Sequence, residues 1–222
     1  MRKKRVGVLI SGRGSNMVAL IEAARDPAFP AEIAVVLSNR PDAGGIERAR
    51  AAGIPALAMD HKAHGSREDF ERAMHAELEH HGVELVCLAG FLRLLTPWFI
   101  ETWRDRMINI HPALLPSYKG LHTHERAMAD GVRIAGCTVH FVRHEMDVGP
   151  IVAQAAVPVL PSDTADSLAA RVLEAEHRLF PLALRLVATG AARVETRANG
   201  SEHVVIDRIA APPAALVWPQ VD

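Results

Sequence analysis

The feature that most constrains the fold of this chain is the alternation of short apolar runs with segments of helical periodicity. Near-continuous apolar runs are typical of strands in a parallel sheet, where both faces are covered. Their alternation with helices predicts an α/β fold: a doubly wound, mostly parallel, twisted sheet flanked by helices. The expected strands are residues 6–10, 33–37, 54–59, 85–89, 107–110, 138–142 and 151–159. The expected helices are 15–25, 44–52, 66–81, 123–130 and one from about residue 164, which Pro181 is expected to kink or end.

The chain has no internal repeat and no linker-like stretch, so residues 1–190 are expected to form a single domain. Residues 138–142 and 151–159 read as paired strands joined by a polar loop. Residues 191–222 read as a C-terminal tail, first a short hairpin appendage and then a Pro-rich, poorly ordered end.

Charge and hydropathy exclude several classes of protein. Lys and Arg total 25 and Asp and Glu 26, which argues against a general nucleic-acid binder. No apolar run approaches the ~20 residues that span a bilayer, and the run after the basic start is too short for a signal peptide, so a cytoplasmic protein without a membrane partner is expected. Cys87 and Cys137 lie in apolar runs and are expected to be buried, reduced thiols.

A Gly-rich turn, Ser11-Gly12-Arg13-Gly14-Ser15-Asn16, joins the first strand to the first helix. Free N–H groups and the positive end of the helix dipole make such a turn an anion site. A plain turn with an N-cap is the alternative. A dinucleotide site is disfavoured because the third Gly and the acidic residue ending the second strand are missing, although Arg40 leaves an NADP enzyme as a weak rival. A single phosphomonoester suits the turn better.

The strongest candidate for catalysis combines Asn109, His111 and Asp147. Residues i and i+2 of a strand point to one side, so Asn109 and His111 face one volume. Asp147 lies in a loop that can fold back over the same edge of the sheet. An amide that donates to an oxyanion, an imidazole that moves protons and a carboxylate that orients the imidazole suit acyl transfer. The alternative is that His111 has no catalytic role, since the chain contains twelve histidines in all.

Metal binding is the other interpretation of the histidines, because His122 and His124 lie close to His111 in the sequence. No set of His and Cys residues has the spacing of a zinc site. No metal is therefore expected.

Six segments make the chain resemble the phosphoribosylglycinamide formyltransferases, folate-dependent enzymes of purine synthesis with a Rossmann-like sheet. The segments are VLISGRGSN (8–16), SREDFERAM (66–74), LAGFLRLLTPWF (88–99), INIHPALLPSYKGLHTH (108–124), GCTVHFVRHEMDVGP (136–150) and EAEHRLFP (174–181). The SGRGSN turn after the first strand is the most specific of them. Several other formyltransferases and a formyltetrahydrofolate hydrolase share the Asn-x-His-Pro and Asp-x-Gly-Pro elements.

The resemblance implies a role for each matching position. Gly14, Ser15 and Asn16 hold the substrate phosphate, and Glu176 binds the ribose hydroxyls. The co-substrate is 10-formyltetrahydrofolate, no metal or nicotinamide is needed, and residues 88–150 bind folate and catalyse within a catalytic domain of residues 1–190. The implied folate-binding residues are Arg67, Leu92, Arg93, Leu94, Leu95, Asn109, Arg143, His144, Glu145, Met146 and Asp147.

The reaction implied is attack of the ribonucleotide amine on the formyl carbon, with Asn109 and protonated His111 stabilising the oxyanion and Asp147 keeping His111 charged. Partners are then small molecules only, and the protein is a monomer or homodimer. The rivals are a formyltetrahydrofolate hydrolase, a methionyl-tRNA formyltransferase, which carries an added RNA-binding domain, and a non-catalytic sensor of folate or a phosphate ligand.

Overall fold

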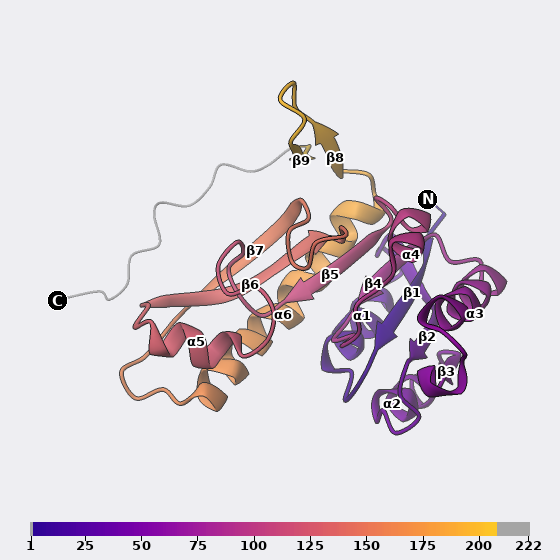
Figure 1. The fold of residues 1–222 in the computed structure, drawn as a ribbon, viewed down its shortest axis with the longest axis horizontal. Coiled ribbons are helices and arrows are strands. Elements are labelled where there is room, and N and C mark those ends of the chain that lie inside the picture. The colour runs from indigo at the N-terminus through magenta and orange to yellow at the C-terminus, as the bar shows by residue number, and fades with distance from the viewer. Residues whose placement is uncertain (1, 208–222) are drawn as a thin grey trace.

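The computed structural model describes residues 2–207, which form a seven-stranded sheet with helices on both faces and a separate two-stranded hairpin (Figure 1). The strands of the sheet lie in the order β3-β2-β1-β4-β5-β6-β7. They are β1 (Lys4–Ile10), β2 (Ala31–Ser38), β3 (Ala56–Ala58), β4 (Leu85–Leu88), β5 (Met107–His111), β6 (Ile134–Phe141) and β7 (Ile151–Pro158). The hairpin consists of β8 (Ala192–Thr196) and β9 (Glu202–Ile206). The helices are α1 (Ser15–Ala24), α2 (Gly45–Ala51), α3 (Arg67–His80), α4 (Pro97–Thr102), α5 (Thr123–Ala129) and α6 (Ala165–Ala188), with one 3₁₀ turn at His61–Ala63.

The first five strands in this order, from β3 to β5, run parallel to one another, whereas β6 runs antiparallel to both β5 and β7. The predicted α/β class and the predicted pairing of the two late strands are therefore confirmed. The C-terminal hairpin is confirmed as well. The Pro-rich end of the tail, residues 208–222, lies outside the described residues.

Alternation within β1 explains why its sequence is almost wholly apolar. Val6, Val8 and Ile10 belong to a core shared with α1 and α6 on one face of the sheet. Leu9 belongs to a second core on the other face, together with residues of α3 and α4 such as Phe70. A strand buried on both faces has no polar alternation, as the sequence pattern required.

Side chains cap the N-termini of the two long helices α3 and α6. Ser66 accepts a hydrogen bond from the N–H of Asp69 at the start of α3, and Thr164 forms a capping box with Ser167 at the start of α6. The short helix α4 begins at Pro97 behind Thr96 and was not expected from the sequence. None of the described helices is long and apolar enough to cross a membrane.

Pro181 was expected to kink or end the last helix, and it does not end it, because α6 continues to Ala188. Proline removes one N–H donor and therefore one backbone hydrogen bond. On both sides of it Phe180, Ala183 and Leu184 are fully buried against the sheet. The burial of this helical face offsets the lost bond.

The sheet order places a switch point between β1 and β4. The chain moves outward from β1 through β2 to β3 and then returns to the other side of β1. In open α/β sheets, ligands bind outside the carboxyl ends of the strands at such a point. The Gly-rich turn follows β1, the segment Leu92 to Leu95 follows β4, and Asn109 and His111 lie at the end of β5, whereas Glu176 lies within α6 and Arg67 begins α3.

Candidate active site

The Gly-rich turn is shaped to leave the first N–H groups of α1 open. Gly14 is the N-cap residue, adopts a left-handed conformation (φ 69°) and leaves no side-chain cap on the helix. The sequence had allowed Ser15 or Asn16 to cap the helix, and neither does so. Gly45, at the start of α2, packs so closely that a Cβ there would lie 3.0 Å from the carbonyl oxygen of Gly12. The turn can therefore present backbone N–H groups to an anion.

Asn16 and Glu176 meet at this turn, 160 residues apart in sequence. The Nδ2 of Asn16 donates to Oε2 of Glu176 over 2.7 Å, and both side chains are buried. Burial raises the pKa of Glu176 to about 7 against the opposing effect of that hydrogen bond. The buried Oδ1 of Asn16 has no hydrogen-bond partner. The two buried side chains, one of them with an unpartnered oxygen, lie beside the Gly-rich turn and are candidates for contacts to a bound ligand.

Asn109, His111 and Asp147 lie together at the end of β5, as their spacing predicted. Nδ1 of His111 lies 3.4 Å from Oδ2 of Asp147, and both side chains are nearly buried. Asn109 pairs in register with His140 of β6, and His111 with Thr138. Because cross-strand partners point to the same face of a sheet, His140 joins the site.

Both ring nitrogens of His111 face acceptors. Its Nε2 lies 2.9 Å from the carbonyl oxygen of Tyr118, and its Nδ1 faces the Asp147 carboxylate. A carbonyl oxygen only accepts, so Nε2 carries a proton in this conformation. The carboxylate of Asp147 on the other side of the ring also only accepts, so the two acceptors fix the orientation of the imidazole.

His140 is held in the neutral state. Its Nδ1 donates to the carbonyl of Phe141 over 3.0 Å, and its Nε2 accepts from Nδ2 of Asn109 over 3.2 Å. Burial lowers the pKa of His140, with the Asp147 charge acting against that effect. This neutral histidine orients the amide of Asn109. His140 was not expected at the site from the sequence, although two-residue alternation along the strand places it on the same face as Thr138.

Asp147 owes its position to an unusual backbone. It is one of few non-glycine residues at positive φ (57°), and its Oδ2 accepts a hydrogen bond from the N–H of Gly120 over 2.8 Å. Two residues later, a Cβ on Gly149 would lie only 1.6 Å from the carbonyl oxygen of Phe141. Only glycine fits there, so the loop returns tightly against β6 and carries the carboxylate to the histidines.

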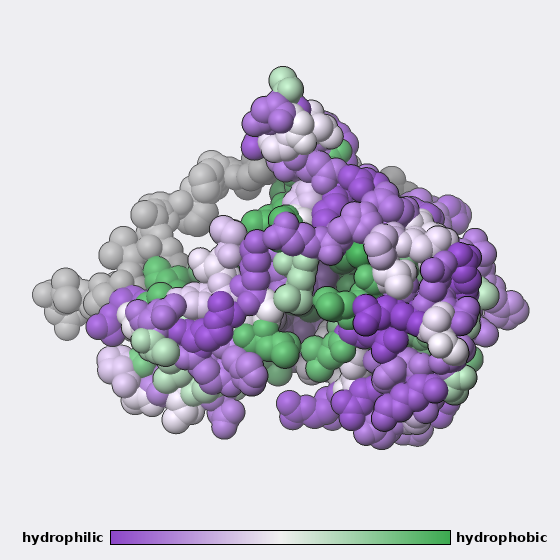
Figure 2. Space-filling model, in the orientation of Figure 1, coloured by the Kyte–Doolittle hydropathy of each residue, from purple (hydrophilic) through white to green (hydrophobic). Residues whose placement is uncertain are grey.

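The predicted folate segments flank a hollow. Leu92 and Leu94 are 72% and 60% exposed, and Met146 on the facing loop is 51% exposed. Figure 2 shows hydrophobic side chains around a central hollow on this face of the molecule. Leu95 is half-buried against the core of α3 and α4. Exposed large apolar side chains that gather at a hollow are typical of a site for a flat, partly apolar ligand.

Ser11 connects the Gly-rich turn of residues 11–16, called the anion turn below, to the first predicted folate segment, residues 92–95. This connection was not expected from the sequence. The hydroxyl of Ser11 donates to Oδ1 of Asn39 over 2.6 Å and accepts from the N–H of Leu92 over 2.8 Å. Ser11 and Asn39 are buried, and the N–H of Ser11 donates to the carbonyl oxygen of Gly90. One hydroxyl therefore connects the carboxyl ends of β1, β2 and β4.

The two arginines expected to meet folate carboxylates surround a buried acid. Glu71 accepts hydrogen bonds from the N–H and hydroxyl of Thr96 and is fully buried. Burial raises the pKa of Glu71, while the charges of Arg67 and Arg93 oppose the rise. Arg67 is exposed, and the guanidinium of Arg93 lies 5.4 Å above the ring of Phe70.

The second folate segment, residues 143–147, is anchored by its first two side chains. Arg143 forms ion pairs with Glu202 and Asp105, and Nε2 of His144 lies 2.6 Å from Oε1 of Glu101. Glu145 remains exposed and lies 3.8 Å from Nζ of Lys119. The side chains of Arg143 and His144 are thus engaged with protein groups, and a ligand would meet this stretch through its backbone.

His122 and His124 do not join His111 in a ligand set. His122 lies at the N-cap of α5, largely exposed, 3.5 Å from Glu125. Within residues 2–207, no group of three or more His, Cys, Asp or Glu side chains is placed to hold a metal ion. Cys87 and Cys137 are free and buried, as predicted.

These features define an α/β protein with an anion turn at the switch point of its sheet and an acid–base cluster at the end of β5. A sequence model of the family described as formyl transferase matches residues 4–184. The chain belongs to the formyl transferase family.

Known proteins agree with that assignment. The chain is 42% identical over 191 residues to the phosphoribosylglycinamide formyltransferase of Escherichia coli, covering 86% of this chain and 90% of that protein. It is 50% identical over 192 residues to the trifunctional purine biosynthetic protein adenosine-3 of Gallus gallus, covering 86% of this chain but only 19% of that protein. The chain thus spans about a fifth of the trifunctional relative. The structure of glycinamide ribonucleotide transformylase 1 from Symbiobacterium toebii superposes with a TM-score of 0.87 at 47% identity, covering 92% of this chain and 94% of that chain.

Proposed function

We propose that this protein transfers the formyl group of 10-formyltetrahydrofolate to the amine of phosphoribosylglycinamide, giving the formylated ribonucleotide of purine biosynthesis and tetrahydrofolate. The observation that carries the proposal is the joint placement of two sites at one sheet edge. An anion turn with a buried Asn16–Glu176 pair lies beside the cluster of Asn109, His111 and Asp147. The names of the relatives support the same reaction.

The ribonucleotide fits the first of these sites. The phosphate would accept hydrogen bonds from the N–H groups of Gly14, Ser15 and Asn16, helped by the positive end of the α1 dipole. The ribose hydroxyls would donate to the Glu176 carboxylate, which accepts one hydrogen bond from Asn16 in this structure. Ionised Glu176 is the form that accepts from hydroxyls, so ribose binding favours loss of its proton.

The formyl carbon would be attacked by the neutral amine of the ribonucleotide. The carbonyl becomes a tetrahedral oxyanion as the new carbon–nitrogen bond forms. One N–H of Asn109 is used by His140, which fixes the amide, and the other is left for the oxyanion. The imidazolium of His111, stabilised by Asp147, supplies a second positive partner.

Collapse of the intermediate breaks the bond between the formyl carbon and the folate nitrogen. The proton lost by the attacking amine passes to that nitrogen through His111 or a bound water. In the present conformation the proton on Nε2 of His111 is bonded to the Tyr118 carbonyl. That bond must open before the imidazole can serve substrate, so the stretch from Tyr118 to Gly120 moves or His111 turns during the cycle.

Folate would lie across the hollow between the two segments identified above, with its ring meeting backbone groups between Leu92, Leu94 and Met146. Arg67 and Arg93 would face its carboxylates. We assign these roles to a catalytic unit of residues 1–190, with residues 191–222 as an appendage. A cytoplasmic monomer or homodimer without a metal stays our prediction, which fractionation, mass measurement and metal analysis would test.

The test is a spectrophotometric assay of purified protein with a 10-formyl folate, with and without the ribonucleotide. Deformylation that requires the ribonucleotide is the expected result. Deformylation without it would identify a hydrolase instead. Tight folate binding with no turnover in either reaction would identify a sensor.

A further inference from the structure

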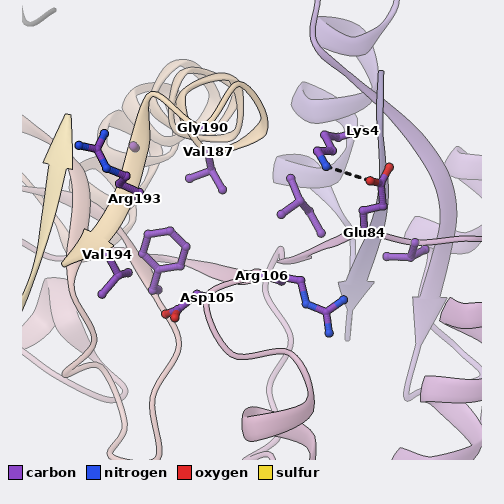
Figure 3. Close-up of a pocket in the computed structure, with 12 residues that line it drawn as sticks. Lys4, Glu84, Asp105, Arg106, Val187, Gly190, Arg193 and Val194 are labelled. Carbon is purple, nitrogen blue, oxygen red and sulfur yellow. Dashed lines mark hydrogen bonds and ion pairs between the residues drawn. The ribbon is translucent and has the colours of Figure 1, made fainter. Parts of the chain in front are cut away.

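The hairpin β8–β9 carries an acidic side chain that reaches the candidate folate loop, residues 143–147. β8 and β9 pair with each other in a sheet separate from the main one. A cleft of about 470 Å³ lies between β8, the end of α6 and the amino ends of β4 and β5 (Figure 3). A second cleft of about 500 Å³ lies between β9 and the segment from Arg143 to Ile151. The hairpin therefore stands partly free of the body and bridges to the loop through specific side chains.

Glu202, the first residue of β9, makes the main polar bridge. Its Oε2 lies 2.6 Å from Nε of Arg143, and its Oε1 accepts from Nη2 of Arg143 over 3.2 Å and from Nη2 of Arg104 over 2.9 Å. Arg143 also donates to Asp105 over 2.6 Å. Its side chain is only 11% exposed, which is low for an arginine. Two-point pairing of a guanidinium with a carboxylate fixes direction as well as distance.

The fixed arginine lies at the start of the loop that ends in Asp147. Nη1 of Arg143 donates back to the carbonyl of Val142, so the side chain holds the backbone at the end of β6. At the other end, Gly149 is pressed against the carbonyl of Phe141. Between these anchors, Asp147 holds a positive φ and faces His111. A displacement of Arg143 would therefore shift the short backbone stretch from Arg143 to Asp147, whose carboxylate faces His111.

We propose that Glu202 is a positioning residue: by holding Arg143, it sets the position of the folate loop and, through the loop, of Asp147. Glu202 touches no reacting atom. The inference rests on the proposed function, since it assigns a residue outside the matched stretch 4–184 to the same site. The alternative is that Glu202 only fastens the hairpin, with no effect on the loop.

The test compares Glu202→Gln with Glu195→Gln. Glu195 lies on the same hairpin, and its carboxylate pairs only with Arg193 among the described residues, so it is a matched control. We expect Glu202→Gln to raise KM for the formyl folate about tenfold, an effect of about 1.4 kcal/mol, and to lower kcat. Its KM for the ribonucleotide should stay within about twofold of the wild-type value. Glu195→Gln is expected to match wild type. A lower Tm for Glu202→Gln with unchanged kinetic constants would overturn the proposal.

Two further measurements separate a local effect on the loop from a general loss of stability. One is a double-mutant cycle, and the other is hydrogen exchange, which does not depend on activity. Arg143→Met and Glu202→Gln should be strongly non-additive in kcat/KM, because they remove the same contact; additive effects would contradict the proposal. The amides of residues 143–148 should exchange about tenfold faster in Glu202→Gln than in wild type or Glu195→Gln. If wild type shows no ribonucleotide-dependent turnover, the proposed function fails, and the exchange rates still decide whether Glu202 holds the loop.

Discussion

At the scale of single residues, the site depends on giving two buried histidines, His111 and His140, different hydrogen-bond partners beside one carboxylate. His140 is buried and makes one hydrogen bond as a donor and one as an acceptor, which requires the neutral ring. His111 faces a carbonyl and a carboxylate, both of which only accept hydrogen bonds. Asp147 lies within 3.7 Å of both rings. Hydrogen-bond partners rather than burial alone separate the two roles, because both histidines are buried.

We expect Asn109→Ala to lower kcat about 100- to 1,000-fold, since it removes an oxyanion donor. His111→Ala and Asp147→Ala should lower it about 100- to 10,000-fold, through loss of proton transfer and of the charge that orients it. Steady-state kinetics with saturating substrates is the measurement. His80→Ala, an exposed position at the end of α3, is the control. A kcat near wild type for His111→Ala would remove it from the mechanism.

Glu176 should make stability depend on pH. Its pKa rises from an ordinary value of 4.5 to about 7 on folding, so the folded state binds more protons than the unfolded state. Folding is then unpenalised below pH 4.5, the penalty grows between pH 4.5 and 7, and it is complete above pH 7. The difference of about 2.5 in pKa corresponds to roughly 3 kcal/mol.

Glu176→Gln removes this penalty. We expect urea unfolding to give the variant a higher free energy of unfolding than wild type at pH 8, by up to roughly 3 kcal/mol, and little difference at pH 4. The same variant should bind the ribonucleotide more weakly, because an amide accepts fewer hydroxyl donors than a carboxylate. A gap in stability that does not change with pH would contradict the assigned pKa.

At the scale of elements, the site depends on how closely β6 approaches its neighbours. β6 carries His140 opposite Asn109 of β5, and on its other side it pairs with β7. Thr138, fully buried, accepts from the N–H of Leu115 and donates to the carbonyl of Ala113, which fixes the chain after His111. Cross-strand register therefore places Asn109, His111 and His140, whereas the loop after β6 places Asp147.

Gly136 makes this approach possible, since a Cβ there would lie 2.0 Å from the carbonyl oxygen of Ala155 on β7. We expect Gly136→Ala to lower the free energy of unfolding by about 1–3 kcal/mol, because the backbone must shift to admit the methyl group. Gly65→Ala is the control, because its added Cβ would make only an ordinary contact of 3.5 Å with Asp69. Equal stability of the two variants in denaturant titrations would mean that β6 and β7 separate more readily than this packing implies.

At the scale of the whole molecule, the ribonucleotide site joins distant parts of the chain. The anion turn belongs to the first strand and helix, whereas Glu176 belongs to α6, which packs along the sheet on the same face as α1 (Figure 1). A ligand held by both would bind the folded state and not the unfolded chain, and so would stabilise the entire fold.

We expect the ribonucleotide at a hundred times its Kd to add about 2.7 kcal/mol to stability. For a chain of this size that raises Tm by about 5–10 °C. Differential scanning calorimetry is the measurement, and the riboside without phosphate should give a much smaller rise at the same concentration. Asn16→Ala should lose most of the effect. A rise equal for the riboside and the ribonucleotide would argue against the anion turn as the phosphate site.

The sequence alone determined the α/β class, the approximate bounds of nearly every strand and helix, and the common direction of Asn109 and His111. These follow from local periodicity, which depends only on the chain's own geometry. The sequence missed the short helix α4, and it allowed α6 to end at Pro181 by a local rule where burial of Phe180 and Leu184 decides.

Only the tertiary structure decided which of these faces meet. It brought Asn16 to Glu176 across 160 residues, His140 to Asn109 through the register of β6, and Glu202 to Arg143 across 59 residues. No periodicity predicts such pairs, because they depend on strand order, on register and on where a loop is anchored. The hydrophobic pattern determines which residues are buried, and the packing of the sheet determines which buried polar groups become neighbours and therefore what their pKa values and hydrogen bonds allow.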